Sequence, residues 1–126
     1  MKRDAADKWF SDVVRAKAAY TCENCHQKGR MECCHIFGRA AKSVRWSLDN
    51  AVCMCHSCHR KYTENPLEFT NWLETYLGKG HLEILREIWN VKMQTNKALR
   101  AEISKHYREE FKKMERDELY QPISYN

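Results

Sequence analysis

Apolar side chains recur at helical spacing near the start of the chain and again in its second half. Residues 4–18 are predicted to form an amphipathic helix whose apolar face consists of Trp9, Phe10, Val13, Val14 and Ala18. A second helix is expected to begin at Asn65-Pro66, which is typical of an N-cap followed by proline at the first helical position. We expect Gly78 and Gly80 to end it. Its apolar face consists of Phe69, Trp72, Leu73, Tyr76 and Leu77.

Two further helices are predicted after these glycines. One carries Leu82, Leu85, Ile88 and Trp89, and the last runs from about Lys97 to Asp117 with a stripe of Leu99, Ile103, Tyr107, Phe111 and Met114. This spacing is what core-facing helices require, so we interpret the aromatic residues as core and not as a cofactor site. The stripes leave two roles open for the helices after residue 65, namely covering the core or forming a dimer interface.

The region from about residue 20 to 64 has a different pattern. It holds all seven cysteines, and short apolar runs at 31–36 and 51–54 predict two strands. No repeat, low-complexity tract or Pro/Gly-rich linker divides the chain. We therefore expect 1–126 to be a single α+β domain with a compact core at 20–64 and a helical extension at 65–118. One helix precedes that core and about three follow it.

Composition narrows the class of protein. At 126 residues and 43% hydrophobic content, the chain can bury one modest core. The first ten residues are polar and charged, and no run approaches 18 apolar residues, so we expect neither secretion nor membrane spanning, and a cytoplasmic location. A net charge of +5 favours an anionic partner. An odd number of cysteines in a reducing compartment favours metal binding over disulfides.

Two Cys-x-x-Cys pairs, 29 residues apart, indicate a zinc site: Cys22, Cys25, Cys55 and Cys58. Four thiolates satisfy tetrahedral Zn²⁺ and leave no open coordination position, so this zinc is predicted to be structural. The alternatives are a redox Cys-x-x-Cys motif or merely buried thiols. His26 and His56 are candidate substitute ligands, although we expect both to be exposed neighbours.

Between and just after the two pairs stand His35, Asn50 and His59, with 14 and then 8 residues between them. The run from Cys22 to about Pro66 resembles an HNH (ββα-metal) endonuclease, in which zinc knuckles bracket a ββα core. Within that superfamily it is most similar to phage recombination endonucleases of the NinG type. The similar segments are Cys33 to Arg39, Arg45-Trp46, Asp49-Asn50 and Cys55 to His59.

The resemblance implies a role for each of these three residues. His35 is the general base, because an imidazole can deprotonate water at neutral pH. His59 is a ligand of a catalytic divalent metal, which stabilises charge on the scissile phosphate. Asn50 tethers the loop that carries His35. Taken one at a time, each residue has an ordinary structural alternative: a buried histidine, a turn former and a neighbour of the zinc site.

The residue before His35 departs from the commonest family pattern, in which Asp or His ligates the catalytic metal. Here it is Cys34, preceded by Cys33. A thiolate would favour Zn²⁺ or Ni²⁺, whereas without it Mg²⁺ or Mn²⁺ would be held by His59, water and phosphate. Both cysteines can equally be small buried residues of a strand. Cys53 is expected to be core.

The predicted DNA-binding residues lie within 18 positions that contain a single acid, Glu32: Lys28, Arg30, Arg39, Lys42 and Arg45. Such a basic segment suits the phosphate backbone of double-stranded or branched DNA. Trp46 can contact bases or fill the hairpin core. In the last predicted helix acids alternate with the basic residues, which is typical of a solvated face.

Three functions are compatible with these features. The first is a DNA endonuclease that acts in recombination in a phage-infected bacterium, for which a homodimer is one compatible state. The second is a non-catalytic zinc-stabilised DNA-binding or phage assembly factor. The third is an adaptor that binds other proteins through its helical tail. Intact His35 and His59 favour the first.

Overall fold

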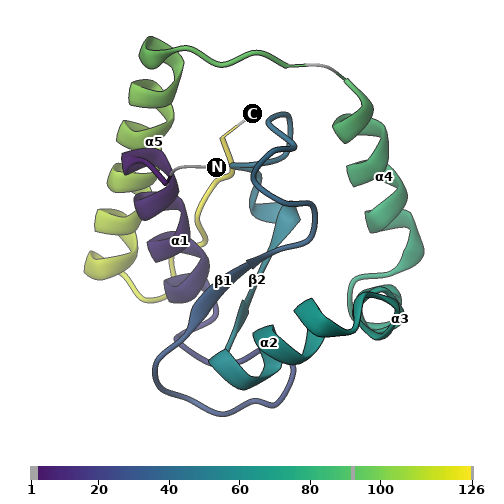
Figure 1. Ribbon diagram of the computed structural model, residues 1–126. Helices are drawn as coiled ribbons and strands as arrows, with labels where there is room; N and C mark the ends of the chain where they lie inside the picture. Colours follow the sequence, from purple (N-terminus) through teal and green to yellow (C-terminus); the bar gives the residue numbers. More distant parts are fainter. Residues whose placement is uncertain (1–2, 92, 126) are drawn as a thin grey trace.

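The computed structural model describes residues 3–91 and 93–125, and in these residues the fold is α+β, as predicted. A two-stranded sheet lies at the centre (Figure 1). Helices α1 (Ala5–Lys17) and α5 (Lys97–Arg116) pack side by side on one side of it. Helix α2 (His56–Glu64) crosses one end of the sheet, and α3 (Pro66–Tyr76) and α4 (Lys79–Asn90) continue along the other side. No helix in the described residues is long and apolar enough to cross a membrane.

The sheet is an antiparallel pair formed by β1 (Glu32–His35) and β2 (Ala51–Met54). Cys34 lies opposite Val52 and His35 lies opposite Ala51. A short 3₁₀ helix, η1 (Leu48–Asn50), leads into β2. The strands predicted at 31–36 and 51–54 are confirmed, and the first is one residue shorter at each end. Helix α2 follows directly, so strand, strand and helix form one local ββα unit.

Helix α1 begins with a capping box in which Asp4 and Asp7 each accept the other's backbone N–H. Its apolar stripe is buried as predicted, with Phe10 and Val13 fully enclosed. The Phe10 ring meets Tyr107 of α5 edge to face, with ring centroids 5.2 Å apart. The two helices therefore bury their apolar faces against each other and against the hairpin.

The last residues of the chain fasten α5 to the loop between the strands. The Tyr107 hydroxyl, fully buried, donates to the carbonyl of Trp46 and accepts from the backbone N–H of Tyr125. The backbone N–H of Leu48 donates to the Ser124 hydroxyl at 3.0 Å. Buried polar groups are costly unless paired, so these bonds fix the position of α5. The sequence left open whether α5 covers the core or forms a dimer interface. In the structure its apolar stripe covers the core.

The start of α3 and the turn from α3 to α4 each differ in one residue from the sequence prediction. Pro66 stands at the first helical position, as expected, but the Asn65 side chain donates to the Lys61 carbonyl and does not cap α3. Gly78 has a φ of +92°, a conformation that glycine adopts without strain. The expectation that Gly80 also ends the helix is wrong, because it lies in the first turn of α4. One glycine is enough to reverse the chain.

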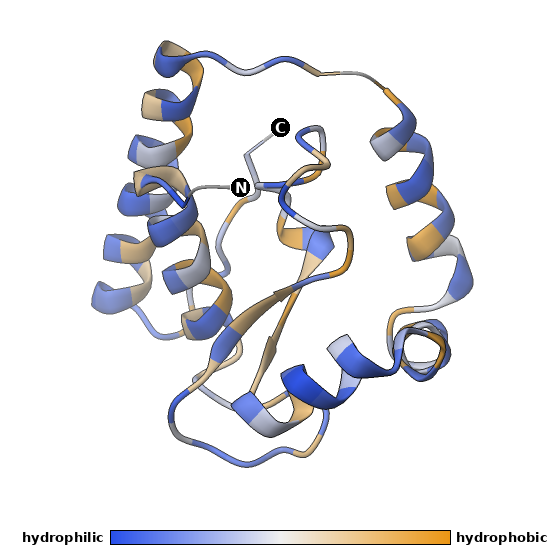
Figure 2. Ribbon diagram, viewed as in Figure 1, coloured by the Kyte–Doolittle hydropathy of each residue, from blue (hydrophilic) through white to orange (hydrophobic). Residues whose placement is uncertain are grey.

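Helix α4 packs on a smaller apolar cluster made of Val44, Leu73, Leu82 and Leu85. Trp89 is 46% exposed, and its ring stacks on Phe37 from the loop after β1 at 5.1 Å. Ile88, predicted as core, is 43% exposed. Figure 2 shows hydrophobic positions along the strands, whereas α2 is mostly hydrophilic. The polar helix α2 buries two side chains, Cys58 and Tyr62, and the Tyr62 ring stacks on Phe69 and Trp72 of α3.

Candidate metal centre and histidine groove

Four cysteine sulfurs gather where the loop after α1 meets the start of α2. The Sγ atoms of Cys22, Cys25, Cys55 and Cys58 all lie within 4.8 Å of one another. The sulfurs of Cys25 and Cys55 are 3.8 Å apart, which equals the edge of a tetrahedron with metal–sulfur bonds of about 2.3 Å. All seven cysteines are free thiols. The predicted ligand set therefore forms a group that can hold a metal ion such as zinc.

Polar groups surround these sulfurs as they do in metal-thiolate sites. Burial alone would raise the pKa of the Cys22 thiol, but backbone N–H groups of Cys25, Cys55 and Asn24 outweigh it and lower the pKa to about 7. The Asn24 side-chain amide donates to Cys58 Sγ at 3.2 Å, and its oxygen accepts from the Tyr62 hydroxyl. The thiolate is thereby favoured at Cys22, whereas burial raises the pKa of the Cys58 thiol to about 12, so a bound cation would be needed to hold all four sulfurs as thiolates.

His26 and His56 are both exposed and lie outside the four-sulfur group. His26 adopts a left-handed conformation (φ +66°) in the turn after Cys25. His56 contacts Glu32 through Nδ1 at 3.0 Å. Neither side chain belongs to the ligand set, in agreement with the expectation that they are exposed neighbours.

A groove of about 830 Å³ opens beside this centre, between α1, β1 and the start of α2. His35 and His59, which stand 24 positions apart in the chain, both line it. The sequence predicted that these two residues converge. The structure brings them to one groove because β1 and α2 belong to the same ββα unit.

His35 is held in one orientation by a backbone contact. Its Nε2 lies 3.1 Å from the carbonyl oxygen of Arg45, and since a carbonyl only accepts, Nε2 carries the proton. The lone pair of the neutral ring is then on Nδ1. Phe10 stacks on the ring at 5.6 Å. Burial lowers the pKa of His35 below its ordinary 6.5, so the imidazole is neutral at pH 7.

Asn50 clamps the loop that follows His35. It is fully buried; its Oδ1 accepts from the backbone N–H of Phe37 at 2.8 Å, and its Nδ2 donates to the Phe37 carbonyl at 2.9 Å. The Asn50 carbonyl also accepts from Ile36 at 2.8 Å. One amide side chain thus satisfies both backbone groups of a residue two positions beyond His35. Only an amide offers a donor and an acceptor in this arrangement.

Asn50→Asp is expected to destabilise the protein by roughly 1–3 kcal/mol, because the carboxylate cannot donate to the Phe37 carbonyl and is itself buried. Urea unfolding of the zinc-loaded protein at pH 7 measures this change. Asn90→Asp, at the exposed end of α4, is the matched control and should alter stability by less than about 0.5 kcal/mol. Equal unfolding midpoints for the two variants would show that the Asn50 clamp carries no stability.

His59 is oriented by an acid that the sequence interpretation passed over. Its Nδ1 lies 2.8 Å from Oε1 of Glu32, and a carboxylate accepts, so Nδ1 carries the proton and Nε2 keeps the lone pair. Burial would raise the pKa of Glu32, but its hydrogen bonds with His56 and His59 outweigh this and lower it. Glu32 is the single acid of the basic segment, and this was the sequence feature that could have indicated its role.

Cys34 does not share the surface of these histidines. Its side chain is 4% exposed, belongs to the main core, and does not line the groove. Burial raises the pKa of its thiol to about 12, so the sulfur is protonated at neutral pH. The expectation that Cys34 ligates a catalytic metal is therefore not supported, and its alternative as a small buried strand residue is what the structure shows. Cys33 lines the groove, and burial raises the pKa of its thiol to about 12 as well. Cys53 belongs to the core, as expected.

The predicted DNA-binding residues divide into three groups. Arg30 and Arg39 line the groove, and Lys28 is exposed on the same loop as Arg30. Lys42 is half-buried and does not line the groove. Arg45 is 3% exposed and forms a buried ion pair with Asp7 of α1 at 2.5 Å, so the prediction that it contacts DNA is not supported in this structure.

Trp46 is likewise core and does not offer a face to bases. It is 3% exposed, and its Nε1 donates to Asp7 Oδ1 at 3.1 Å. Asp7 thus binds two consecutive residues of the loop between the strands. The main signal for this contact is an acid among the otherwise apolar positions of the first helix, and sequence spacing alone does not identify its partner.

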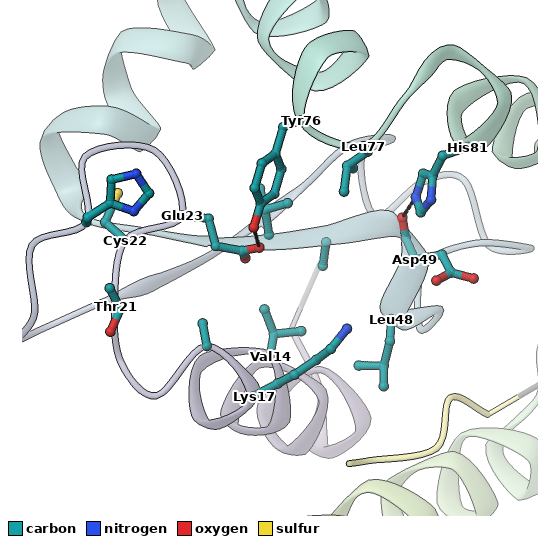
Figure 3. A pocket seen from close by; sticks show the side chains of 14 residues that line it. Val14, Lys17, Thr21, Cys22, Glu23, Leu48, Asp49, Tyr76, Leu77 and His81 are labelled. Atoms are coloured by element: carbon teal, nitrogen blue, oxygen red, sulfur yellow. Dashed lines mark hydrogen bonds between the residues drawn. The ribbon is translucent and has the colours of Figure 1, made fainter.

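A second hollow of about 360 Å³ lies between α1, η1 and the turn from α3 to α4 (Figure 3). There the Tyr76 hydroxyl donates to Glu23 at 2.7 Å, and His81 Nε2 lies 2.7 Å from the Asp49 carbonyl. The other carboxylate oxygen of Glu23 accepts from the Cys53 backbone at 2.6 Å. Through these bonds Glu23 links Tyr76 of α3 to β2, and His81 links α4 to η1.

Comparison with protein-family models, with curated proteins and with solved structures finds no match to this chain.

Proposed function

We propose that this protein is a metal-dependent DNA endonuclease built on an HNH (ββα-metal) core, with His35 as the general base. The observation that carries the proposal is the fixed orientation of His35: Nε2 donates to the Arg45 carbonyl, which leaves Nδ1 as the basic atom. The sequence resemblance and the shared groove of His35 and His59 support it.

The reaction is hydrolysis of a phosphodiester. Nδ1 of His35 takes a proton from water, the water oxygen attacks phosphorus, and the bond from phosphorus to the O3′ of the leaving nucleotide breaks. The departing O3′ takes a proton from a second water, and His35 releases its proton to solvent. The lowered pKa of His35 keeps the imidazole neutral at pH 7, as a base must be. The Asn50 clamp holds the adjoining loop, so the ring does not lose entropy when substrate binds.

A catalytic divalent ion would be held by Nε2 of His59, because Nδ1 is engaged by Glu32. A carboxylate on the far nitrogen of a ligating histidine is the usual support for such a ligand. When bound, the ion stabilises negative charge on the phosphate oxygens. Of the described residues that line the groove, His59 would be the imidazole ligand, and water and substrate phosphate would supply the other ligands, a donor set that suits Mg²⁺ or Mn²⁺.

The four-cysteine site holds a structural Zn²⁺ in this proposal. Cys55 caps α2 and Cys58 lies in its first turn, so the metal fixes the start of the helix that carries His59. Cys22 and Cys25 tie the same point to the loop after α1. The zinc therefore sets the distance between His35 and His59 without taking part in the chemistry.

His35→Ala is expected to reduce cleavage of supercoiled plasmid by about 100-fold or more in Mg²⁺, Mn²⁺ or Ni²⁺, because it removes the proposed general base. The matched control is His106→Ala, which removes an imidazole from α5 outside the groove. It should retain wild-type cleavage. Equal cleavage rates for wild type and His35→Ala with every metal would contradict the nuclease proposal.

The same assay separates the alternative functions. Salt-sensitive DNA binding without cleavage would favour the zinc-stabilised DNA-binding factor, and the burial of Cys34 away from the groove is the observation that keeps that alternative. The similarity to phage recombination nucleases makes branched DNA the first substrate to test. A four-way junction should then be cut faster than a linear duplex of the same sequence.

A further inference from the structure

Four residues of the N-terminal segment form a polar stripe along α1 that faces the groove. Asp7, Ser11 and Arg15 are spaced four residues apart on one side of α1, Arg3 continues this spacing just before the helix begins, and all four line the groove. This polar stripe lies beside the apolar face that the sequence predicted for the helix. The four-residue interval between these polar side chains was the sequence feature that could have predicted the stripe.

The charge of the stripe is positive once its internal pairing is considered. Asp7 is 4% exposed and is neutralised by the buried Arg45, which donates to it through Nε at 3.0 Å and pairs through Nη2 at 2.5 Å. The other acid of the groove, Glu32, is engaged by His56 and His59. Arginines therefore dominate the field in the groove, which concentrates anions there.

Arg3 and Arg15 are both available to a phosphate. Arg3 is exposed and donates to the neutral hydroxyl of Ser11 at 3.0 Å. Arg15 pairs with Asp12 near the surface, and such a pair contributes at most about 1 kcal/mol, so a phosphate can compete for the guanidinium. The planar fork of arginine matches phosphate oxygens better than an ammonium does.

We propose that Arg3 and Arg15 bind the phosphate backbone of the nucleic-acid substrate, so that α1 is a substrate-binding element of the groove together with Arg30 and Arg39. The Arg3 guanidinium reaches along α1 to Ser11, which is one helical turn before Arg15, so both guanidinium groups lie at the same wall of the groove. Neighbouring phosphates of one strand can then contact both. This inference rests on the proposed function, because it takes the groove as the DNA site.

The test is equilibrium binding of a fluorescent 20-base-pair duplex to zinc-loaded protein without Mg²⁺, over a range of NaCl concentrations. Arg3→Gln/Arg15→Gln should reduce the slope of log K against log salt by about 1.8, or about 0.9 for each lost phosphate contact. Affinity at physiological salt should fall roughly 10- to 100-fold. Arg3→Lys/Arg15→Lys should retain the slope, because it keeps the charge.

The matched control is Arg108→Gln/Lys112→Gln, which removes two exposed cations from α5, outside the groove. It should keep the wild-type slope. The inference is overturned when both Gln pairs give the same slope. Should the α1 double variant fail to fold, Arg3→Gln alone is expected to lower the slope by about 0.9, and an unchanged slope overturns the inference.

Cleavage of plasmid by wild type and by His35→Ala distinguishes this inference from the proposed function. Cleavage that depends on His35, with an unchanged slope in Arg3→Gln/Arg15→Gln, overturns the α1 contact and leaves the nuclease. A reduced slope without cleavage in any metal supports the α1 contact and overturns the nuclease. Wild-type protein that does not bind the duplex overturns both.

Discussion

Removing the metal with an excess of chelator at pH 7 is expected to unfold the protein. Zinc bound by four cysteines contributes roughly 10–16 kcal/mol to small zinc-nucleated folds, which equals or exceeds the total stability of a typical domain. Cys22 and Cys58 are also part of the main apolar core, together with Phe10 of α1 and Tyr107 of α5. Loss of the metal therefore disturbs α1 and α5 as well as the hairpin. Far-ultraviolet circular dichroism during chelation measures the change.

A cysteine substitution gives the same result without chelator. Cys58→Ser should lose the bound zinc, measured by elemental analysis of the purified protein, and should unfold at a much lower temperature. Cys33→Ser is the matched control because Cys33 lies outside the four-sulfur group, and it should retain one zinc per chain. Full zinc content in Cys58→Ser, or an unchanged melting temperature after chelation, would contradict a structural zinc at this site.

Asp7→Ala is expected to destabilise the zinc-loaded protein by about 3–5 kcal/mol, the usual consequence of leaving a buried charge without its partner. The Asp7 carboxylate accepts from Arg45 at 3.0 Å, from the Trp46 indole at 3.1 Å and from the backbone of Asp4 at 3.0 Å. Its removal takes away the carboxylate with which the buried Arg45 guanidinium pairs. Urea unfolding at pH 7 measures the loss.

The control for Asp7 is another acid on the same helix. Asp12→Ala removes a carboxylate that pairs with Lys8 and Arg15 near the surface, and it should cost no more than about 1 kcal/mol. Asp7→Leu/Arg45→Met should be more stable than Asp7→Ala, because it removes both buried charges. Equal stabilities of Asp7→Ala and Asp12→Ala would refute the importance of the buried pair.

Acid should weaken this pair in a defined direction. Burial would raise the pKa of Asp7, but hydrogen bonds from Arg45 and from the backbone of Asp4 outweigh it, so the pKa is below the ordinary 3.8. A lowered pKa in the folded state means that the carboxylate stabilises the protein above about pH 4. That contribution is lost as the pH falls through the lower, folded-state value.

The buried pair also joins the stability of the fold to the orientation of the proposed base. Arg45 offers its side chain to Asp7 and its carbonyl to His35, so α1 fixes the backbone that accepts from Nε2. Asp7 is in this sense a positioning residue for His35 although the two are 28 positions apart in the sequence. Substitutions at Asp7 should therefore be judged on both stability and cleavage.

The sequence by itself determined the features that depend on neighbours along the chain. Helical spacing predicted α1, α3, α4 and α5, and short apolar runs predicted the two strands, because each element needs one periodic apolar face wherever it packs. The paired cysteines predicted the four-sulfur group, since two knuckles present four sulfurs to one point. The order of His35, Asn50 and His59 predicted residues that the ββα unit brings near one groove.

Only the tertiary structure decided which partner each polar side chain meets. Arg45 was predicted to be a DNA contact, but it pairs with Asp7, 38 positions earlier, because α1 packs against the loop between the strands. Glu32 supports His59 across 27 positions, and the pleat of β1 turns Cys34 into the core. Spacing fixes which face of its own element a residue occupies, whereas packing fixes what lies opposite that face. That is why the sequence predicted the cysteine site and several residues of the groove, whereas the wall formed by α1 and the support from Glu32 emerged only from the structure.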